Sequence, residues 1–216
     1  MAADSRPKVA TGPERPDRPG AGAEWARVMN QPVSPMKEKL ARTGIRMFRE
    51  QGYDQVGVRD ICRELGVTTG SFYHHFKNKD EILMFMVGQG RQRILPYLEP
   101  AEGESPSQRL LSLFADAMCE TFLEEGPQLC AQRMFRQHLP SNRSHALESA
   151  VQTLAEQAIK AGELGSALSA AEIARTLILE MRGVEYDWCM LHPDSDLRAT
   201  MRRQIGLLLE ALKETH

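Results

Sequence analysis

The sequence predicts an all-α fold, and three features carry that prediction. Apolar residues recur at intervals of three and four along most of the chain after residue 33, which is the spacing of one helix face. No segment combines the alternating pattern of a strand with hairpin-turn residues. The breaks in the helical pattern coincide with glycine, proline or asparagine, which end helices. With 216 residues and 42% hydrophobic content, the chain can bury a core.

Residues 1–33 differ in composition from the rest of the chain. They are rich in proline, glycine, alanine and arginine and contain almost nothing apolar, so we expect a disordered arm. Trp25 is the exception and could dock on the body of the protein or on a partner. The arginines of the arm could add contacts to phosphates, but a solvated tail is the simpler interpretation.

The next segment predicts an amphipathic helix that Gly52 ends. Its apolar stripe consists of Leu40, Ala41, Gly44, Met47 and Phe48. Glycine at position 44 costs roughly 1 kcal/mol relative to alanine unless close packing compensates. A second helix follows, with a stripe of Val58, Ile61, Cys62 and Leu65. Gly66 is placed to stop it in the left-handed conformation, whereas Val56 and Gly57 offer a weak cap at its start.

A third, shorter helix is expected to begin at Thr68 or Thr69, either of which can cap it, and to bury Phe72 and Phe76. Asn78 then caps a fourth helix that we expect to run from Lys79 towards Pro96. Two short helices separated by the tight turn at residues 65–68 make a helix-turn-helix, and the second of them can enter a DNA major groove. Small side chains at its start let the backbone approach base edges, while tyrosine, histidine and lysine reach bases or phosphates.

The charge distribution agrees with an anionic partner for this part of the chain. Residues 36–95 contain eleven Lys and Arg against seven Asp and Glu, a net charge of +4. Residues 96–216 contain eleven against eighteen, a net charge of −7. A basic excess of this size is also common on solvated helices, so it favours nucleic acid only together with the helix-turn-helix.

These residues resemble the TetR family of one-component bacterial transcriptional regulators. The resemblance lies in FREQGY at residues 48–53, VRDICRELGV at 58–67 and TTGSFYHHFKNKDEI at 68–82. It implies a dimer on a palindromic DNA operator and a variable helical C-terminal domain that binds a small effector. Together with the outward-facing positions of the third helix, it gives ten candidate DNA-binding residues: Arg59, Thr68, Thr69, Gly70, Ser71, Tyr73, His74, His75, Lys77 and Lys79. Lys79 matches a position that reaches a phosphate, and Arg59 one that touches a base or phosphate.

The last two helices contain long apolar stripes that would suit a homodimer interface. One stripe consists of Ile173, Leu177, Met181, Val184, Trp188 and Leu191, the other of Leu197, Met201, Ile205, Leu208 and Leu212. The alternative is that both stripes pack on their own domain. We favour the dimer because one recognition helix alone binds DNA weakly.

Thioether, thiol and aromatic side chains are candidates for an effector pocket, because such walls adapt to varied apolar shapes. They are Met118, Cys119, Phe122, Met134, Phe135, Tyr186, Trp188 and Cys189. An ordinary core would use the same residues. Polar groups of an effector could be oriented by Arg133, Arg136, His138 and Glu185.

Several other functions have little support in the sequence. The four cysteines form no CxxC pair, so we expect buried thiols and a cytoplasmic protein. No apolar run is long enough to span a membrane, and the first 30 residues lack a signal peptide. Cys189 and His192 are a weak metal or redox hint, and we expect no metal or cofactor. An enzyme is disfavoured because the helical metal and nucleotide motifs are missing.

The sequence therefore predicts three segments: an arm at residues 1–33, a DNA-binding domain at 34–82, and an effector-binding and dimerisation domain at 83–216. The predicted function is a transcriptional regulator whose operator affinity falls when a small molecule binds. The resemblance implies a repressor, because repression is the commoner mode of regulation in the family. The alternative is a DNA-binding regulator that has no small-molecule effector and is controlled by a protein partner.

Overall fold

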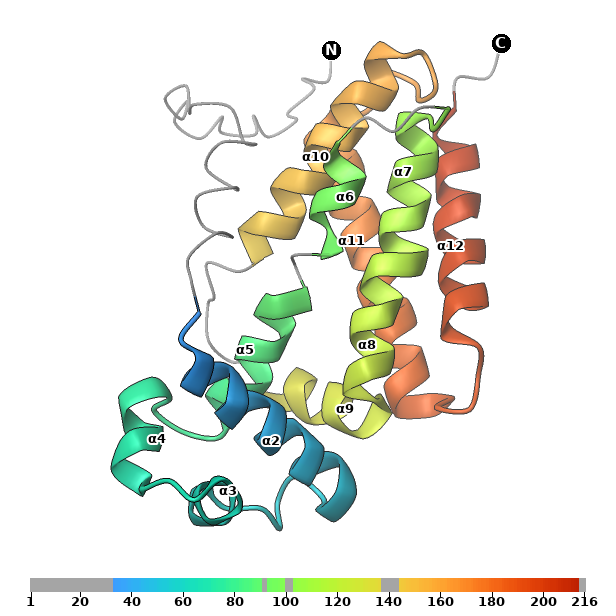
Figure 1. The fold of residues 1–216 in the computed structure, drawn as a ribbon. Helices are drawn as coiled ribbons and strands as arrows, with labels where there is room; N and C mark the ends of the chain where they lie inside the picture. The colour runs from blue at the N-terminus through green and yellow to red at the C-terminus, as the bar shows by residue number, and fades with distance from the viewer. Residues whose placement is uncertain (1–32, 91–92, 100–102, 137–143, 214–216) are drawn as a thin grey trace, which may run out of the picture.

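The computed structural model describes residues 33–90, 93–99, 103–136 and 144–213, and every regular element in these ranges is a helix. The all-α prediction is confirmed. Figure 1 shows a small N-terminal domain at one end of the molecule and an upright bundle of the later helices above it. The expected arm and Trp25 lie outside the described residues, apart from Val33.

Four helices build the N-terminal domain: α2 (Pro35–Gln51), α3 (Val58–Leu65), α4 (Thr69–His75) and the start of α5 (Asp80–Gly90). The predicted ends at glycine are confirmed, since Gly52 has φ 91° and Gly66 has φ 66° in the left-handed region. The centre of the domain is filled by fully buried rings and branched side chains: Leu40, Phe48, Ile61, Phe72, Phe76, Ile82 and Leu83. The four helices are therefore held by one shared core.

Gly44 has a packing reason for its place in α2. A Cβ atom at this position would lie 2.8 Å from Cδ1 of Ile82 and 3.3 Å from Cδ1 of Ile61. Glycine thus lets α2 approach α5 and α3 closely, which compensates for its poor helix propensity.

The segment expected to form the fourth helix contains two described helices. They are α5 (Asp80–Gly90) and, after residues 91–92, which lie outside the described ranges, the short helix α6 at Leu95–Leu98. Pro96 stands in the first turn of α6, where proline is tolerated. The predicted domain boundary between residues 82 and 83 falls within α5, whose Leu83 and Phe85 still pack in the N-terminal core.

The C-terminal domain contains the remaining elements. They are α7 (Pro106–Ser112), η2 (Leu113–Met118), α8 (Cys119–Glu125), α9 (Pro127–Arg136), α10 (Ser144–Lys160), α11 (Ala170–Tyr186), η3 (Asp187–Leu191) and α12 (Leu197–Ala211). The two π-helical segments continue their neighbours, so α7, η2 and α8 form one rod, and α11 and η3 another. Gly126, with φ 83°, separates α8 from α9, as the sequence predicts.

The two apolar stripes predicted for the dimer interface lie mostly inside the domain. Ile173, Leu177, Met181, Val184 and Trp188 are buried in the C-terminal core, together with Leu197, Met201 and Ile205. Leu208 and Leu212 pack against that core, and only Leu191 is exposed. The interface prediction was wrong about these residues, because the stripes pack on their own domain.

All four cysteines are buried and unpaired, as predicted. Burial raises the pKa of the Cys119 thiol to about 12 and that of Cys189 to about 11. These groups therefore remain protonated thiols at neutral pH. No helix in the described ranges is both long and apolar enough to cross a bilayer.

Candidate functional site

Helix α4 is fixed at its start by a cap and a sharp turn. The Thr68 side-chain oxygen accepts a hydrogen bond from the Ser71 backbone N–H at 3.2 Å, so Thr68 rather than Thr69 is the N-cap. The backbone N–H of Val67 donates to the carbonyl of Cys62 at 2.9 Å, closing the end of α3. The turn between the two helices is thus built from local contacts alone.

The two faces of α4 differ sharply in burial. Phe72 is 0% exposed and Phe76 2%, whereas Tyr73 is 58% exposed. His74, Thr69 and Gly70 are also exposed, and Ser71 and His75 are half-buried. The prediction that two phenylalanine rings hold the helix down while its hydroxyl and imidazole groups face outward is confirmed.

The two adjacent histidines lie edge to face with ring centroids 4.9 Å apart. The pKa of His75 is lowered by partial burial and, to a smaller extent, by the positive charges of His74 and Lys37. Among the described residues, no group of three or more His, Cys, Asp or Glu could hold a metal ion. The pair therefore fits a polar surface better than a metal site.

Lys79 has a structural role that the sequence did not indicate. Its Nζ donates to the carbonyl oxygens of Tyr53 at 2.7 Å and Val56 at 3.0 Å. It also lies 4.3 Å from the centroid of the Tyr53 ring. Two of the three ammonium protons thus stabilise the connection between α2 and α3, which leaves one for a phosphate. Lys77 is exposed and is not drawn into that connection.

The start of α3 is better capped than the sequence suggested. The Asp60 side chain accepts a hydrogen bond from the Gly57 backbone N–H at 2.9 Å. Asp60 thus supplies one half of a capping box, and its position three residues after Gly57 is the signal that sequence reasoning missed. Arg59 is exposed in the first turn of α3, in the same domain as α4.

The eight predicted effector residues differ in burial. Cys119, Phe122, Trp188 and Cys189 are buried in the C-terminal core, and Met118 and Met134 pack against it. Phe135 is 64% exposed and Tyr186 48%. Cys189 contacts the Met134 sulfur at 3.5 Å, whereas His192 pairs with Asp187 at 3.1 Å. Cys189 and His192 therefore point to different partners.

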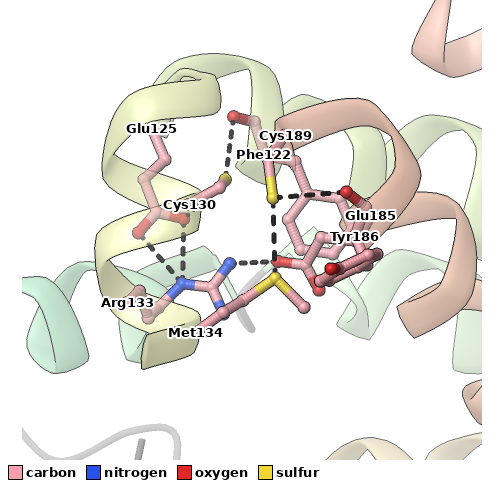
Figure 2. A network of polar contacts seen from close by, with 8 residues as sticks. All are labelled: Phe122, Glu125, Cys130, Arg133, Met134, Glu185, Tyr186 and Cys189. Carbon is pink, nitrogen blue, oxygen red and sulfur yellow. Dashed lines mark hydrogen bonds and ion pairs between the residues drawn. The ribbon is translucent and has the colours of Figure 1, made fainter. Parts of the chain in front are cut away.

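The predicted polar anchors are engaged with each other. Arg133 donates through Nε to both carboxylate oxygens of Glu125, at 2.9 and 3.0 Å, and through Nη2 to Glu185 (Figure 2). All three side chains are buried. Burial raises the pKa of Glu125, and the charge of Arg133 only partly offsets this. The Arg136 side chain and His138 lie outside the described residues.

A described cleft lies elsewhere, at the end of the bundle far from α4. Its volume is about 590 Å³. It is lined by residues of α7, of the connection after α10 and of α12, including Ser107, Glu163, Gly206, Glu210 and Lys213. None of the eight predicted effector residues is among them.

The N-terminal domain matches a known family of regulatory proteins. Residues 40–84 match the family model described as "Bacterial regulatory proteins, tetR family". The transcriptional regulator YwcC of Bacillus subtilis is 34% identical over 71 residues, 32% of each chain. The transcriptional repressor DhaR of Mycobacterium sp. is 33% identical over 97 residues, 43% of this chain and 48% of that protein. The matches thus span less than half the length of these relatives.

Solved structures share the whole fold. A chain from a study of antibiotic control by bacterial hormones has a TM-score of 0.65 at 19% identity, covering 85% of this chain and all of that one. A SmeT–triclosan complex has a TM-score of 0.64 at 18% identity, with 84% and 93% coverage. Thermus thermophilus FadR in complex with lauroyl-CoA has a TM-score of 0.59 at 20% identity, with 83% and 96% coverage. At these identities the likeness concerns the fold.

Proposed function

The chain belongs to the TetR family of bacterial regulators, and from this premise we propose that it is a homodimeric repressor that binds a palindromic DNA operator. Proteins of this family are transcriptional regulators and not enzymes. The observation that carries the proposal is the two-sided burial of α4, with Phe72 and Phe76 inside and Tyr73 exposed. Such a helix can enter a major groove without disturbing its own domain.

The ten candidate residues divide into three groups. Thr69, Gly70, Tyr73 and His74 lie on the exposed side of α4, where side chains reach base edges. Arg59, Lys77 and the remaining proton of Lys79 are suited to phosphates, which position the protein without reading sequence. Thr68, Ser71 and His75 lie at the edge of the helix and support its orientation.

The outer face of α11 and α12 is the proposed dimer interface. It carries Leu179, Tyr186 and Leu207, which are 53%, 48% and 57% exposed. Gly183 and Gly206 lie on the same two helices, and a Cβ atom at either would meet nothing within 4 Å. Large apolar side chains beside small residues favour close packing of helices. Two α4 helices would then be held about one DNA turn, roughly 34 Å, apart.

We further propose that a small apolar effector lowers operator affinity. The support comes from relatives of the same fold whose structures contain triclosan or lauroyl-CoA. The mechanism is a two-state equilibrium in which the effector favours the state with the wrong α4 spacing. The alternative is a DNA-binding regulator that has no small-molecule effector and is controlled by a protein partner.

The experiment selects duplexes from a random-sequence library with the intact protein and then measures affinity by fluorescence anisotropy. We expect enrichment of a palindrome and a stoichiometry of two chains per half-site pair. Tyr73→Ala should weaken this duplex more than a scrambled one, by about 1–3 kcal/mol. Equal loss on both duplexes, or no enriched sequence, would contradict sequence-specific binding.

A further inference from the structure

Helix α9 packs into both cores, since Leu129 belongs to the N-terminal core and Cys130 to the C-terminal core. Leu129 is 2% exposed, and among the described residues it is the only one beyond Phe85 in the N-terminal core. Arg133, one turn further along, is 5% exposed inside the C-terminal domain. Figure 1 shows α9 beside α2 and α5 on one side and the lower ends of α8 and α11 on the other. The position of α9 therefore determines how the N-terminal domain sits on the bundle.

Three buried charges fix α9 from the bundle side. Glu125 stands in the last turn of α8, and its two carboxylate oxygens share the single N–H of Arg133 Nε. Glu185 stands in the last turn of α11 and accepts from Nη2 of the same guanidinium. Figure 2 shows Arg133 between the two carboxylates, with Cys130 and Met134 flanking it. The planar guanidinium accepts only a narrow range of positions for both partners.

The energetics of such a triad favour a role in orientation. Desolvation of buried charges largely cancels their attraction, so replacing a buried ion cluster with apolar residues is often neutral for stability. Removal of one partner is costly, because the others stay buried without a counter-charge. The triad therefore selects one geometry of α8, α9 and α11 more than it adds net stability.

We propose that the Glu125–Arg133–Glu185 triad is a latch that holds α9, and through Leu129 the N-terminal domain, in one position on the bundle. Arg133 and Glu185 are then positioning residues for DNA binding, although neither touches DNA. Glu185 directly precedes Tyr186, which lies on the outer face of α11. The latch therefore links the proposed dimer interface to α4, the proposed recognition helix. The DNA part of this inference rests on the proposed function.

The test uses the full chain with all three charged side chains replaced by apolar ones, Glu125→Leu, Arg133→Met and Glu185→Leu together, so that no buried charge is left unpaired. The matched control is Asp116→Asn with Arg202→Met, which removes an exposed ion pair between η2 and α12 that does not involve α9. Amide hydrogen exchange is followed in α2, α5, α9, α10 and α12. Thermal unfolding is recorded for both variants.

We expect the neutral triad to unfold near the temperature of the unaltered protein, while amides of α9 and of its contacts in α2 and α5 exchange about tenfold faster. Affinity for the selected duplex should fall about tenfold, a usual size for coupling between sites. The control should change neither measurement. Leu129→Ala should lower duplex affinity as well. When it is combined with the neutral triad, the loss of binding free energy should be smaller than the sum of the two separate losses.

Two outcomes would overturn the latch. In the first, amide exchange in α9 stays unchanged, which would show that apolar side chains hold α9 in place as well as the triad does. In the second, amide exchange in α9 becomes faster but the affinity for the duplex is unchanged, so α9 does not position the recognition helix α4. Should the unaltered protein bind no duplex at all, the proposed function fails, while the exchange measurements alone still support or overturn the attachment of α9.

Discussion

The two domains place their candidate functional residues in different ways. In the N-terminal domain, all ten candidates come from residues 59–79, and the side on which each α4 residue lies follows from which side carries Phe72 and Phe76. In the C-terminal domain, the eight candidates come from three segments between residues 118 and 189. Their helices pack on several neighbours at once. Local periodicity therefore predicts which side of one helix is exposed better than it predicts which side chains from several helices meet.

The largest expected effect tests whether the N-terminal site depends on its two phenylalanines. Phe72→Ala should cost the N-terminal domain about 3–5 kcal/mol, since a fully buried ring leaves a cavity. Calorimetry should then show an early transition for this domain, with the bundle transition retained. Tyr73→Ala is the control on the exposed side of the same helix and should leave both transitions in place. A single shifted transition would show that the two domains unfold as one unit.

The next prediction tests the outer face of the C-terminal helices. Leu207→Glu places a charge on a half-exposed side chain of α12, so it should separate the dimer without unfolding the chain. Sedimentation should give the mass of one chain, and operator affinity should fall because only one α4 remains bound. Leu123→Glu, at a side chain of α8 that is 43% exposed, is the matched control. Dissociation by both changes alike would argue against the α11–α12 face.

A smaller effect separates the two lysines beside α4. Lys79→Met removes both hydrogen bonds to the connection between α2 and α3 and should cost about 1–2 kcal/mol of stability. Lys77→Met should leave stability within about 0.5 kcal/mol. It should instead reduce the slope of log affinity against log salt by about one phosphate contact. Chemical denaturation and salt titration of both variants measure these effects, and an unchanged salt slope for Lys77→Met would contradict its phosphate contact.

The sequence was sufficient for the helix-turn-helix, because its caps, glycine stops and buried rings are all local signals. It was not sufficient for Lys79, whose backbone acceptors lie 23 and 26 residues earlier. Nor could it tell the inner face of α11 from the outer one, since Leu177 is buried and Leu179, also apolar, is 53% exposed. The Glu125–Arg133–Glu185 triad joins three helices, and the separation of 52 residues between Arg133 and Glu185 leaves no local pattern.

The smallest expected effect concerns pH and the N-terminal domain alone. The pKa of His75 is lowered from 6.5 by partial burial, with His74 and Lys37 adding to the shift. A base with a lowered pKa in the folded state contributes stability above its unfolded pKa, and loses it as pH falls through the folded value. The free energy of unfolding of this domain should therefore decrease between pH 7 and pH 5. His75→Gln should make that decrease smaller, and Lys37→Met should also make it smaller, because the folded-state pKa of His75 rises towards its ordinary value. The titration of the His75 ring by NMR measures the shift directly, and a pKa at or above 6.5 would assign the pH dependence to other groups. A confirmed shift would show that the charge at the edge of α4 depends partly on Lys37 of α2, whereas the exposure of its side chains follows from the local positions of Phe72 and Phe76.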